Sequence, residues 1–400
     1  MAAKIRIGFN ARYLRDYNLR GFNRYTLSLL TELQNRGEFE LVLFTDKRSP
    51  IHPAFAEAIR AEIVEITSPR VLIWEQLVLP MAFRRHHIDL FHALADGGLP
   101  AWKTCPYVLT YHHAPDKSLK HFIARGELSG RMDDYLDGDR GINGQYLKRR
   151  AELLRWIYLH SANRIIAVSR YGKWELVELL GVPEEKVEII YEAADASFSP
   201  DVPRATVEEA RARYDLPRRY LLFVSGFDRR KNVPGLLRAF HEAKRTGVQE
   251  ALVLVGTGGD LPAAKLLART LGLREGRDIV FLQRIHDELP AVYCGATAFV
   301  TLSWSESFCL PMLEAMSCGT PIIASNRGAI PEIMRDGGIL VDPRNRDGAV
   351  QAIKEVTSRT DLRTKLRAEA LKRAKEFSWQ KTAEQTTLVY REILDCVAQR

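Results

Sequence analysis

The stretch Ser303–Pro321, SWSESFCLPMLEAMSCGTP, decides the fold that the sequence predicts. An apolar run ends near Leu302 and predicts a strand that leads into a polar loop. Pro311 can stand at the start of a helix, because its missing N–H would have no partner there. Gly319 and Pro321 should end this helix after about two turns. The segment therefore predicts a strand, a loop and a helix, which is the repeating element of a parallel α/β sheet.

The start of this helix predicts an anion site. The amides of Phe308, Cys309 and Leu310 should point out of the helix beyond the carboxyl end of the strand, where a phosphate can bind. Glu306 is expected in the loop and Glu314 in the first turn, both facing one crevice. Carboxylates accept hydrogen bonds from neighbouring hydroxyls, which suits a sugar ring and a ribose. Alternatively, Glu314 only stabilises the positive helix end, by ~0.3–1 kcal/mol.

A cationic cluster follows another predicted strand, in the segment VSGFDRRKN that contains Gly226, and is expected to open the next helix. Arg230 and Lys231 are adjacent cations that could neutralise a diphosphate and stabilise it as a leaving group. A charged turn without a ligand is the alternative. The glycine-rich turn Gly256–Gly259 follows the next strand and would allow a ligand close to the backbone, but it does not match the G-x-G-x-x-G pattern of dinucleotide sites.

The rest of the chain alternates apolar runs with amphipathic stretches, which indicates parallel β-α-β units. Strands are predicted at residues 5–9, 41–44, 90–91, 107–110, 164–168, 220–224, 251–255, 279–282, 298–300 and 321–324. The stretch from Ala194 to Pro217 has the composition of a linker. We therefore expect an α/β protein of two doubly wound, Rossmann-like domains, at residues 1–195 and 215–378, with a helix over about 379–400 that packs on the first domain.

Composition narrows the class of protein. Four hundred residues suit two domains, and five scattered cysteines argue against a disulfide framework or a zinc ribbon. No apolar run approaches the ~20 residues of a membrane helix, and we expect no secretory signal and a cytoplasmic location. The net charge of +8 favours anionic partners, but no nucleic-acid-binding module is recognisable. Residues 125–146 predict an inserted loop, either a lid over an acceptor or a plain surface loop.

Together these segments resemble the retaining GT-B glycosyltransferases called family 4, over nearly the whole chain. The resemblance rests on SWSESFCLPMLEAMSCGTPIIAS, FVSGFDRRKNVPGLLRAF, LVLVGTGG, WEQLVLP, DLFHA, TYHH, the long segment ANRIIAVSRYGKWELVELLGVPEEKVEIIYEAAD and FSWQKTAEQTTLVY. It implies a GT-B fold with two Rossmann-like domains and a central cleft. It also implies that Glu306 contacts the donor sugar, Glu314 the ribose, and Arg230 with Lys231 the diphosphate.

The resemblance also assigns residues outside these clusters. His112, in the T-x-H segment, should lie near the donor sugar and the acceptor. The family's glycine loop, G-x-G-R-Y, matches Gly21 to Tyr25, with Asn23 in place of the second glycine. Backbone groups around Arg284 and Ile285 would recognise the base.

Other departures from the family pattern lie in both halves of the chain. The family's E-G-F-G-L is Glu306-Ser307-Phe308-Cys309-Leu310 here, and Glu192 stands where asparagine is common.

We therefore expect a retaining hexosyltransferase, for instance of polysaccharide biosynthesis. It would move a sugar from a nucleotide-diphosphate sugar to a glycan, lipid-linked or natural-product acceptor, with no metal, no cofactor and no nucleic acid. Retention would follow from attack on the front face of the sugar, with the departing phosphate accepting the acceptor's proton. A basic surface on the first domain could touch an anionic membrane. A nucleotide-sugar epimerase or a glycoside phosphorylase of related fold is the alternative, and a nucleic-acid-binding protein is a more distant one.

Overall fold

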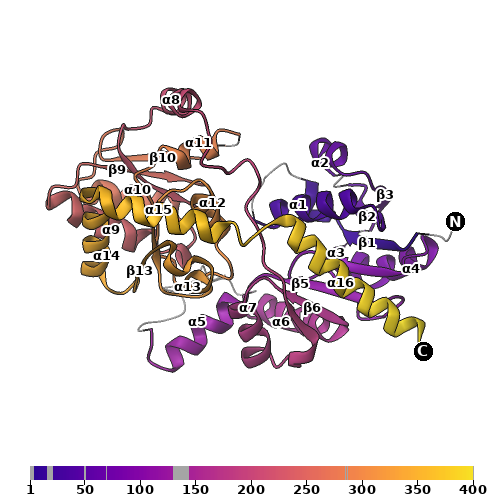
Figure 1. Cartoon of the computed structure of the whole chain (residues 1–400). Helices are drawn as coiled ribbons and strands as arrows, with labels where there is room; N and C mark the ends of the chain where they lie inside the picture. The colour runs from indigo at the N-terminus through magenta and orange to yellow at the C-terminus, as the bar shows by residue number, and fades with distance from the viewer. Residues whose placement is uncertain are drawn as a thin grey trace. The chain divides into compact units, whose positions relative to one another are not determined.

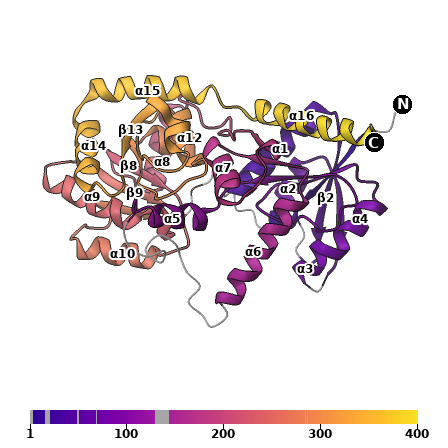
Figure 2. The same ribbon diagram turned by 90° about the horizontal axis from the view of Figure 1, so that it is seen from below.

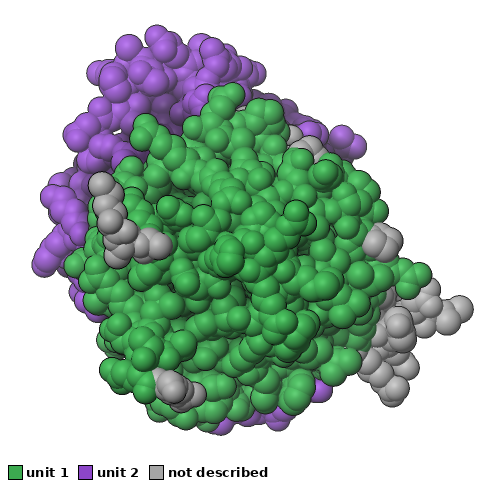
Figure 3. Space-filling model, turned by 90° about the vertical axis from the view of Figure 1, so that its right-hand side faces the viewer, with its two compact units in different colours: residues 1–113, 139–192, 378–400 green, residues 114–138, 193–377 purple. Residues whose placement is uncertain are grey.

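A computed structural model describes residues 4–15, 21–48, 51–68, 70–128, 144–283, 285 and 287–399. By the contacts between its residues, the chain divides into two compact units (Figures 1 and 3). Unit 1 comprises residues 1–113, 139–192 and 378–400, and unit 2 comprises residues 114–138 and 193–377.

Unit 1 contains a parallel sheet of seven strands in the order β3-β2-β1-β4-β5-β6-β7. The strands are β1 (Arg6–Asn10), β2 (Glu40–Asp46), β3 (Glu62–Ile66), β4 (Leu90–Ala93), β5 (Tyr107–Tyr111), β6 (Arg164–Ala167) and β7 (Val187–Ile189). Every residue of β4 and β5 is buried, because helices cover both faces of a parallel sheet. In the register, Ile7 lies opposite Leu41 on one side and Leu90 on the other.

The helices of unit 1 include one from the far end of the chain. They are α1 (Gly21–Arg36), α2 (Pro53–Ala58), α3 (Val71–Ile73), α4 (Leu79–Arg85), α6 (Gly144–Ser161), α7 (Arg170–Trp174) and α16 (Trp379–Ala398). Short 3-10 helices form η1 (Arg12–Arg15) and η5 (Glu184–Lys186), and π-helical segments form η2 (Trp74–Val78) and η4 (Glu175–Leu179). The ring of Trp379 packs edge-on against Tyr25 of α1 at 5.7 Å, and Thr382 Oγ1 donates to Tyr191 O at 2.7 Å. The helix predicted near 379 therefore completes the first unit, as expected (Figure 2).

Unit 2 contains a parallel sheet of six strands in the order β10-β9-β8-β11-β12-β13. The strands are β8 (Tyr220–Val224), β9 (Ala251–Val255), β10 (Ile279–Leu282), β11 (Ala298–Thr301), β12 (Ile322–Ser325) and β13 (Gly338–Val341). The strand order reverses between β8 and β11, so their connections leave on opposite faces of the sheet. Ligands of doubly wound sheets bind beyond the carboxyl ends of the strands at such a point. The two loops that carry the predicted site residues start there.

The helices of unit 2 cover this sheet, and an apolar face of α9 lies in its core. The helices are α5 (Pro115–Ala124), α8 (Arg204–Arg213), α9 (Val233–Arg245), α10 (Leu261–Thr270), α11 (Leu289–Cys294), α12 (Leu310–Ser317), α13 (Ile330–Met334), α14 (Arg346–Ser358) and α15 (Thr360–Ala374), with turns η6 (Arg229–Lys231) and η7 (Arg335–Gly337). Leu236, Leu237 and Phe240 of α9 are fully buried. None of the helices in the described part of the chain is long and apolar enough to cross a membrane.

The sequence missed three strands, and all of them lie at sheet edges. β3 and β7 flank the sheet of unit 1, and β13 is an edge of the sheet of unit 2. β3 and β7 lack the continuous apolar run by which the other strands were predicted, because charged residues interrupt it: β3 reads EIVEI, with one buried residue, and β7 reads VEI. β13 reads GILV and was missed although it contains a short apolar run.

The sequence assigned residues 114–128 to the first domain, whereas their contacts place them in unit 2. Leu119 and Leu128 are buried and pack against Trp304 in the loop after β11. Most of the predicted insert, residues 129–143, lies outside the described residues, and α6 begins at Gly144.

Candidate active site

The cationic turn η6 is fixed to the loop after β11 by two hydrogen bonds. Asn232 Nδ2 donates to Leu302 O at 3.0 Å, and the Trp304 amide donates to Arg230 O at 2.8 Å. Asn232 has a left-handed backbone (φ +52°) and caps α9 by accepting from the Gly235 amide at 3.2 Å. We predicted that Arg230 and Lys231 begin a helix, but they form this separate turn before it, because Asn232 breaks the helical path.

Glu306 joins the two cations in one cluster. Lys231 Nζ donates to Glu306 Oε1 at 2.7 Å, and Arg230 Nη1 donates to Oε2 at 3.0 Å and to Ser305 O at 2.8 Å. All three side chains are largely buried, with exposed fractions of 13% for Lys231, 19% for Arg230 and 7% for Glu306. Two cations share this carboxylate, and Arg230 Nε also lies 3.6 Å from Asp228 Oδ1, so the charges balance while the cationic N–H groups remain suited to an anion.

Burial and the neighbouring charges shift the pKa values of this cluster in opposite directions, and the charges have the larger effect. Burial alone would raise the pKa of Glu306, but the charges of Lys231 and Arg230 outweigh it and lower this pKa to about 2. Burial would lower the pKa of Arg230, yet the charges of Glu306 and Asp228 leave it raised. Glu306 is therefore an ionised carboxylate that only accepts hydrogen bonds.

The N-terminus of α12 lies directly after this cluster in the chain. Cys309 caps the helix with a left-handed backbone (φ +75°), at a position where the resembling sequences have glycine. Its carbonyl accepts from the Met312 amide at 2.9 Å. Within the described chain, the amides of Cys309 and Leu310 donate to no protein group, so both remain available to an anion. The buried ring of Phe308 packs edge-on against Phe377.

The predicted place of Glu314 in the first turn of the helix is wrong. Because α12 already begins at Leu310, Glu314 is its fifth residue and lies in the second turn. Its side chain is buried, and Tyr293 Oη donates to Glu314 Oε2 at 2.9 Å. Tyr293 comes from α11, and nothing in the sequence linked it to the E-x7-E pattern.

Glycines of the neighbouring loops pack closely against the backbone of the loops that form the site. A Cβ atom on Gly256 would lie 1.8 Å from Ser225 O, and one on Gly259 (φ +53°) would lie 2.4 Å from the carbonyl carbon of Phe227. The glycine-rich turn therefore packs on the loop that contains Gly226. A Cβ atom on Gly328 (φ +63°) would lie 2.2 Å from Glu306 O, so this glycine, which the sequence analysis overlooked, supports Glu306.

Unit 1 holds His112 in a buried pair with Glu192. His112 Nδ1 lies 3.0 Å from Glu192 Oε1, and Nε2 lies 3.1 Å from Leu94 O. The Leu94 carbonyl only accepts, so Nε2 donates to it, and an ionised Glu192 would favour a proton on Nδ1 as well. Burial lowers the pKa of His112, but the hydrogen bond and charge of Glu192 outweigh it and leave the pKa raised.

A carboxylate that the sequence analysis did not single out lies beside His112. Asp96 Oδ1 accepts hydrogen bonds from the backbone amides of His112 and His113, and burial raises the pKa of Asp96. Its only sequence signal is the D-G-G turn just beyond β4.

The remaining predicted residues lie in both units. Gly21 and Asn23 are the first and third residues of α1, where we had expected a loop. Ile285 is buried in unit 2, and Arg284 lies outside the described residues. Among the residues that the structure describes, no group of three or more His, Cys, Asp or Glu side chains could hold a metal ion.

Comparison with known proteins identifies the family. Residues 206–373 match the family described as Glycosyl transferases group 1, and residues 19–198 match Glycosyltransferase Family 4. O-antigen chain mannosyltransferase B of Escherichia coli is 29% identical over 388 residues, which cover 94% of this chain and 97% of that protein. A D-inositol 3-phosphate glycosyltransferase of Nocardioides sp. is 32% identical over 251 residues, which cover 58% of this chain and about half (54%) of that relative.

Solved structures share the architecture of the whole chain. Sucrose-phosphate synthase from Thermosynechococcus elongatus superposes with a TM-score of 0.74 at 21% identity, covering 98% of this chain and 100% of that one. Anabaena HepE in complex with UDP and glucose superposes with a TM-score of 0.73 at 16% identity, covering 97% and 100%. Two family matches that together span most of the chain, and a fold of two doubly wound units, lead to one conclusion: the chain belongs to the family 4 (group 1) glycosyltransferases of the GT-B fold.

Proposed function

We propose that this glycosyltransferase takes a hexose from a nucleotide-diphosphate sugar and transfers it, with retention of anomeric configuration, to a glycan or lipid-linked acceptor. The observation that carries the proposal is the buried cluster of Glu306, Arg230 and Lys231, next to the N-terminus of α12 at the switch point of the unit 2 sheet. It combines anion-binding groups with a carboxylate that accepts from hydroxyls, the two chemistries that a sugar nucleotide requires.

The diphosphate would bind the positive part of the site. Arg230 and Lys231 would supply cationic N–H donors, and the amides of Cys309 and Leu310 add further donors. When the glycosidic bond breaks, the diphosphate gains negative charge, so these fixed donors should stabilise the transition state more than the bound donor. Glu306 would accept from hydroxyls of the transferred sugar, and Glu314 from the ribose.

Retention would follow from attack on the face that the diphosphate leaves. The bond from the anomeric carbon to the phosphate oxygen breaks, the bond to the acceptor oxygen forms, and the acceptor's proton passes to the departing phosphate. This route needs no second carboxylate base, unlike the paired acids of glycosidases. His112, held as an imidazolium by Glu192 and Leu94, would supply a fixed positive charge and could not take up a proton.

The names of similar proteins guide the choice of substrates. The Escherichia coli relative is named as a mannosyltransferase of the O-antigen chain, and the Anabaena structure contains UDP and glucose. A mannosyl or glucosyl donor and a polysaccharide-type acceptor are therefore the first substrates to test. We further propose that the protein works without a metal in the cytoplasm, and that its excess of basic residues lets it touch an anionic membrane surface.

The test uses the full chain with a panel of UDP- and GDP-hexoses, glycan acceptors and EDTA. We expect transfer that EDTA does not abolish, and NMR of the product should show the anomeric configuration of the donor. An inverted product would contradict retention, and loss of activity with EDTA would contradict metal independence. Isomerisation of the donor without an acceptor would indicate the epimerase, and a requirement for phosphate would indicate the phosphorylase.

A further inference from the structure

Unit 2 contains a polar pocket at the amino ends of its strands, opposite the strand ends that carry the candidate active site. The site loops follow the carboxyl ends of β8 and β11, whereas the pocket is lined by Arg219, Glu250, Thr297 and Pro321. Each of these residues directly precedes a strand: β8, β9, β11 and β12 respectively. In a parallel sheet all amino ends share one edge, so the pocket spans the amino ends of four neighbouring strands. Its volume is about 630 Å³.

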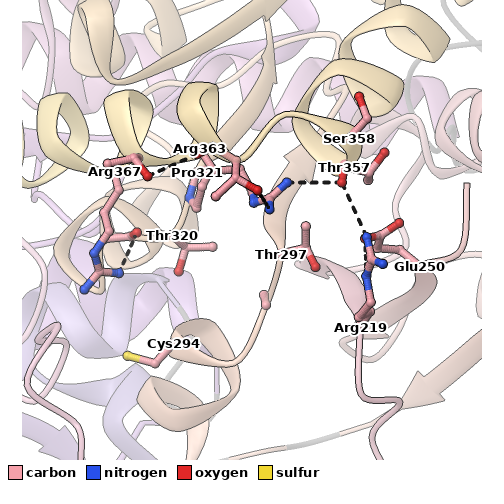
Figure 4. Close-up of a pocket in the computed structure, with 14 residues that line it drawn as sticks. Arg219, Glu250, Cys294, Thr297, Thr320, Pro321, Thr357, Ser358, Arg363 and Arg367 are labelled. Carbon is pink, nitrogen blue, oxygen red and sulfur yellow. Dashed lines mark hydrogen bonds and ion pairs between the residues drawn. The ribbon is translucent and has the colours of Figure 1, made fainter.

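One wall of this pocket is a single face of α15. Thr360, Arg363, Thr364 and Arg367 all line it, and their spacing of three and four residues places them on one side of the helix. Figure 4 shows Arg363 and Arg367 extending from the ribbon of α15, with Cys294 on the side of Arg367 and Arg219 with Glu250 on the other. The helix therefore presents two guanidinium groups and two hydroxyls to the same space.

The charges of the lining do not cancel. Arg219 Nε donates to Glu250 Oε1 at 2.9 Å, so these two residues neutralise each other. Arg363 and Arg367 form no ion pair with any carboxylate in the part of the chain that the structure describes. With no other charged residue in the lining, the pocket carries a net charge of about +2, and such a concentration of one sign attracts a counter-ion.

A purely structural role accounts for part of this arrangement. Arg363 Nη1 donates to Val356 O at 2.7 Å, and Arg367 Nη1 donates to Gly319 O at 3.0 Å, so each arginine binds carbonyls at the end of a helix. These bonds use only part of the five N–H donors of each guanidinium. Among the described residues, Nε and Nη2 of Arg367 donate to no protein group. These carbonyls hold both guanidinium groups in place, and the N–H groups that they do not use remain available to a ligand.

We propose that this pocket, defined by Arg363, Arg367, Thr360 and Thr364, binds a small phosphate-bearing anion. Two arginines one helical turn apart can bind one phosphate group, since the planar guanidinium matches its oxygens. Thr360 Oγ1 accepts from Arg363 Nη2 at 2.8 Å and keeps its own proton to donate, whereas Thr364 Oγ1 already donates to Thr360 O at 3.0 Å. The inference concerns a site separate from the sugar-transfer centre and does not depend on the proposed function.

Cys294 lines the pocket, so its reactivity can report whether a ligand is bound there. This thiol is partly exposed, and a hydrogen bond with the Cys318 side chain, together with the charge of Arg367, lowers its pKa despite burial. A lowered pKa increases the thiolate that reacts with iodoacetamide. Cys396 on α16 is exposed and serves as an internal control in the same peptide digest.

The first experiment measures alkylation of Cys294 by peptide mass spectrometry, with inorganic phosphate titrated against chloride at constant ionic strength. We expect phosphate to slow the reaction at Cys294 in a saturable way, by about tenfold at ten times its dissociation constant, and to leave Cys396 unchanged. Equal rates in phosphate and chloride would overturn the proposal.

Variants then separate this pocket from the active site. Phosphate protection should disappear in the double variant Arg363→Gln/Arg367→Gln and persist in Lys231→Ala, whose change lies in the other site. Arg359→Gln is the matched control, because Arg359 is an exposed arginine paired with Asp361. If the double variant does not fold, Thr364→Glu places a carboxylate between the two arginines without removing them, and it should also abolish protection. Protection that survives Thr364→Glu, or that disappears in Lys231→Ala, would contradict the assignment.

Discussion

Lys231 Nζ lies 2.7 Å from Oε1 of Glu306, although the two residues belong to loops that follow different strands. The carboxylate holds the cation at the switch point, so an incoming diphosphate must share the cation with Glu306. Breaking this pair should therefore lower the stability of the fold and raise the affinity for the diphosphate.

Replacing Glu306 by glutamine tests this opposition. Glu306→Gln leaves two largely buried cations without their shared carboxylate, which should cost about 3–5 kcal/mol of the free energy of unfolding. The affinity for UDP or GDP should rise, because the carboxylate no longer competes for the cations, while transfer is lost with the sugar contact. Denaturant titration and calorimetry measure both quantities, and weaker nucleotide binding would contradict the prediction.

The same carboxylate predicts an acid-sensitive part of the stability. The folded pKa of Glu306 is about 2, below its ordinary value of 4.5, so its contribution is complete above 4.5 and is lost as the pH falls toward 2. The difference in the free energy of unfolding between the wild type and Glu306→Gln should therefore shrink over this interval. A constant difference between pH 5 and pH 2.5 would show that the ion pairs do not stabilise the fold.

Removing one cation should mainly affect turnover. Lys231→Ala is expected to lower kcat about 10²–10³-fold with a smaller loss of donor affinity, because the cation acts on charge that develops in the transition state. Arg230→Ala should behave similarly. Arg229→Ala is the matched control: Arg229 lies 3.5 Å from Asp260 and forms no ion pair with Glu306 in the described structure. Equal, small losses in all three variants would identify the cluster as a charged turn.

The hydrogen bond between Tyr293 and Glu314 should matter for nucleotide affinity. Tyr293→Phe removes one donor from the buried carboxylate, which at about 0.5–1.5 kcal/mol corresponds to a two- to tenfold weaker binding of nucleoside diphosphate. Glu314→Ala should weaken binding further. Tyr220→Phe is the control, since its hydroxyl donates to the backbone carbonyl of Val292 at 2.6 Å and not to a carboxylate of the site. Calorimetric dissociation constants that are the same for both tyrosine variants would contradict the ribose role.

The left-handed backbone at Cys309 predicts that glycine is more stabilising than alanine at this position, the reverse of the usual order. A side chain costs about 1–2 kcal/mol in this conformation, so Cys309→Gly should be more stable than Cys309→Ala by about that amount. At Cys318, whose φ is −77°, the order should reverse, with glycine about 0.5–1 kcal/mol less stable than alanine. Denaturant titration of the four variants checks the prediction, and alanine above glycine at both positions would refute it.

The buried pair of His112 and Glu192 predicts a pH effect of the opposite sign to that of Glu306. Because the folded pKa of His112 is raised above its ordinary value of 6.5, the pair stabilises the protein fully below pH 6.5, and this contribution is lost as the pH rises through the folded pKa. Glu192→Gln should lower the pKa of His112, which NMR titration of the ring protons reports. Its cost in stability should be larger at pH 5.5 than at pH 9, and a pH-independent cost would contradict the ion pair.

The sequence alone was enough to predict the central strands, the two doubly wound units and the returning C-terminal helix. These features follow from local patterns: apolar runs that must be buried on both faces, and amphipathic helices between them. The same patterns failed at the edge strands β3 and β7, where charged residues interrupt the apolar run, and the short apolar run of β13 was missed. They also failed for residues 114–128, because the partner of Leu119 and Leu128 is Trp304, distant in the chain.

Within the site, the sequence supplied the residue types, and tertiary structure decided their partners. The E-x7-E spacing and the R-R-K run were visible, but the pairing of Lys231 with Glu306 depends on the order of β8 and β11 in the sheet. The Tyr293–Glu314 bond and the contacts of His112 with Glu192 and Leu94 likewise arise between separate segments of the chain. A local pattern can fix a helix or a strand, whereas a buried charge takes its state from whichever groups the fold places within hydrogen-bonding distance.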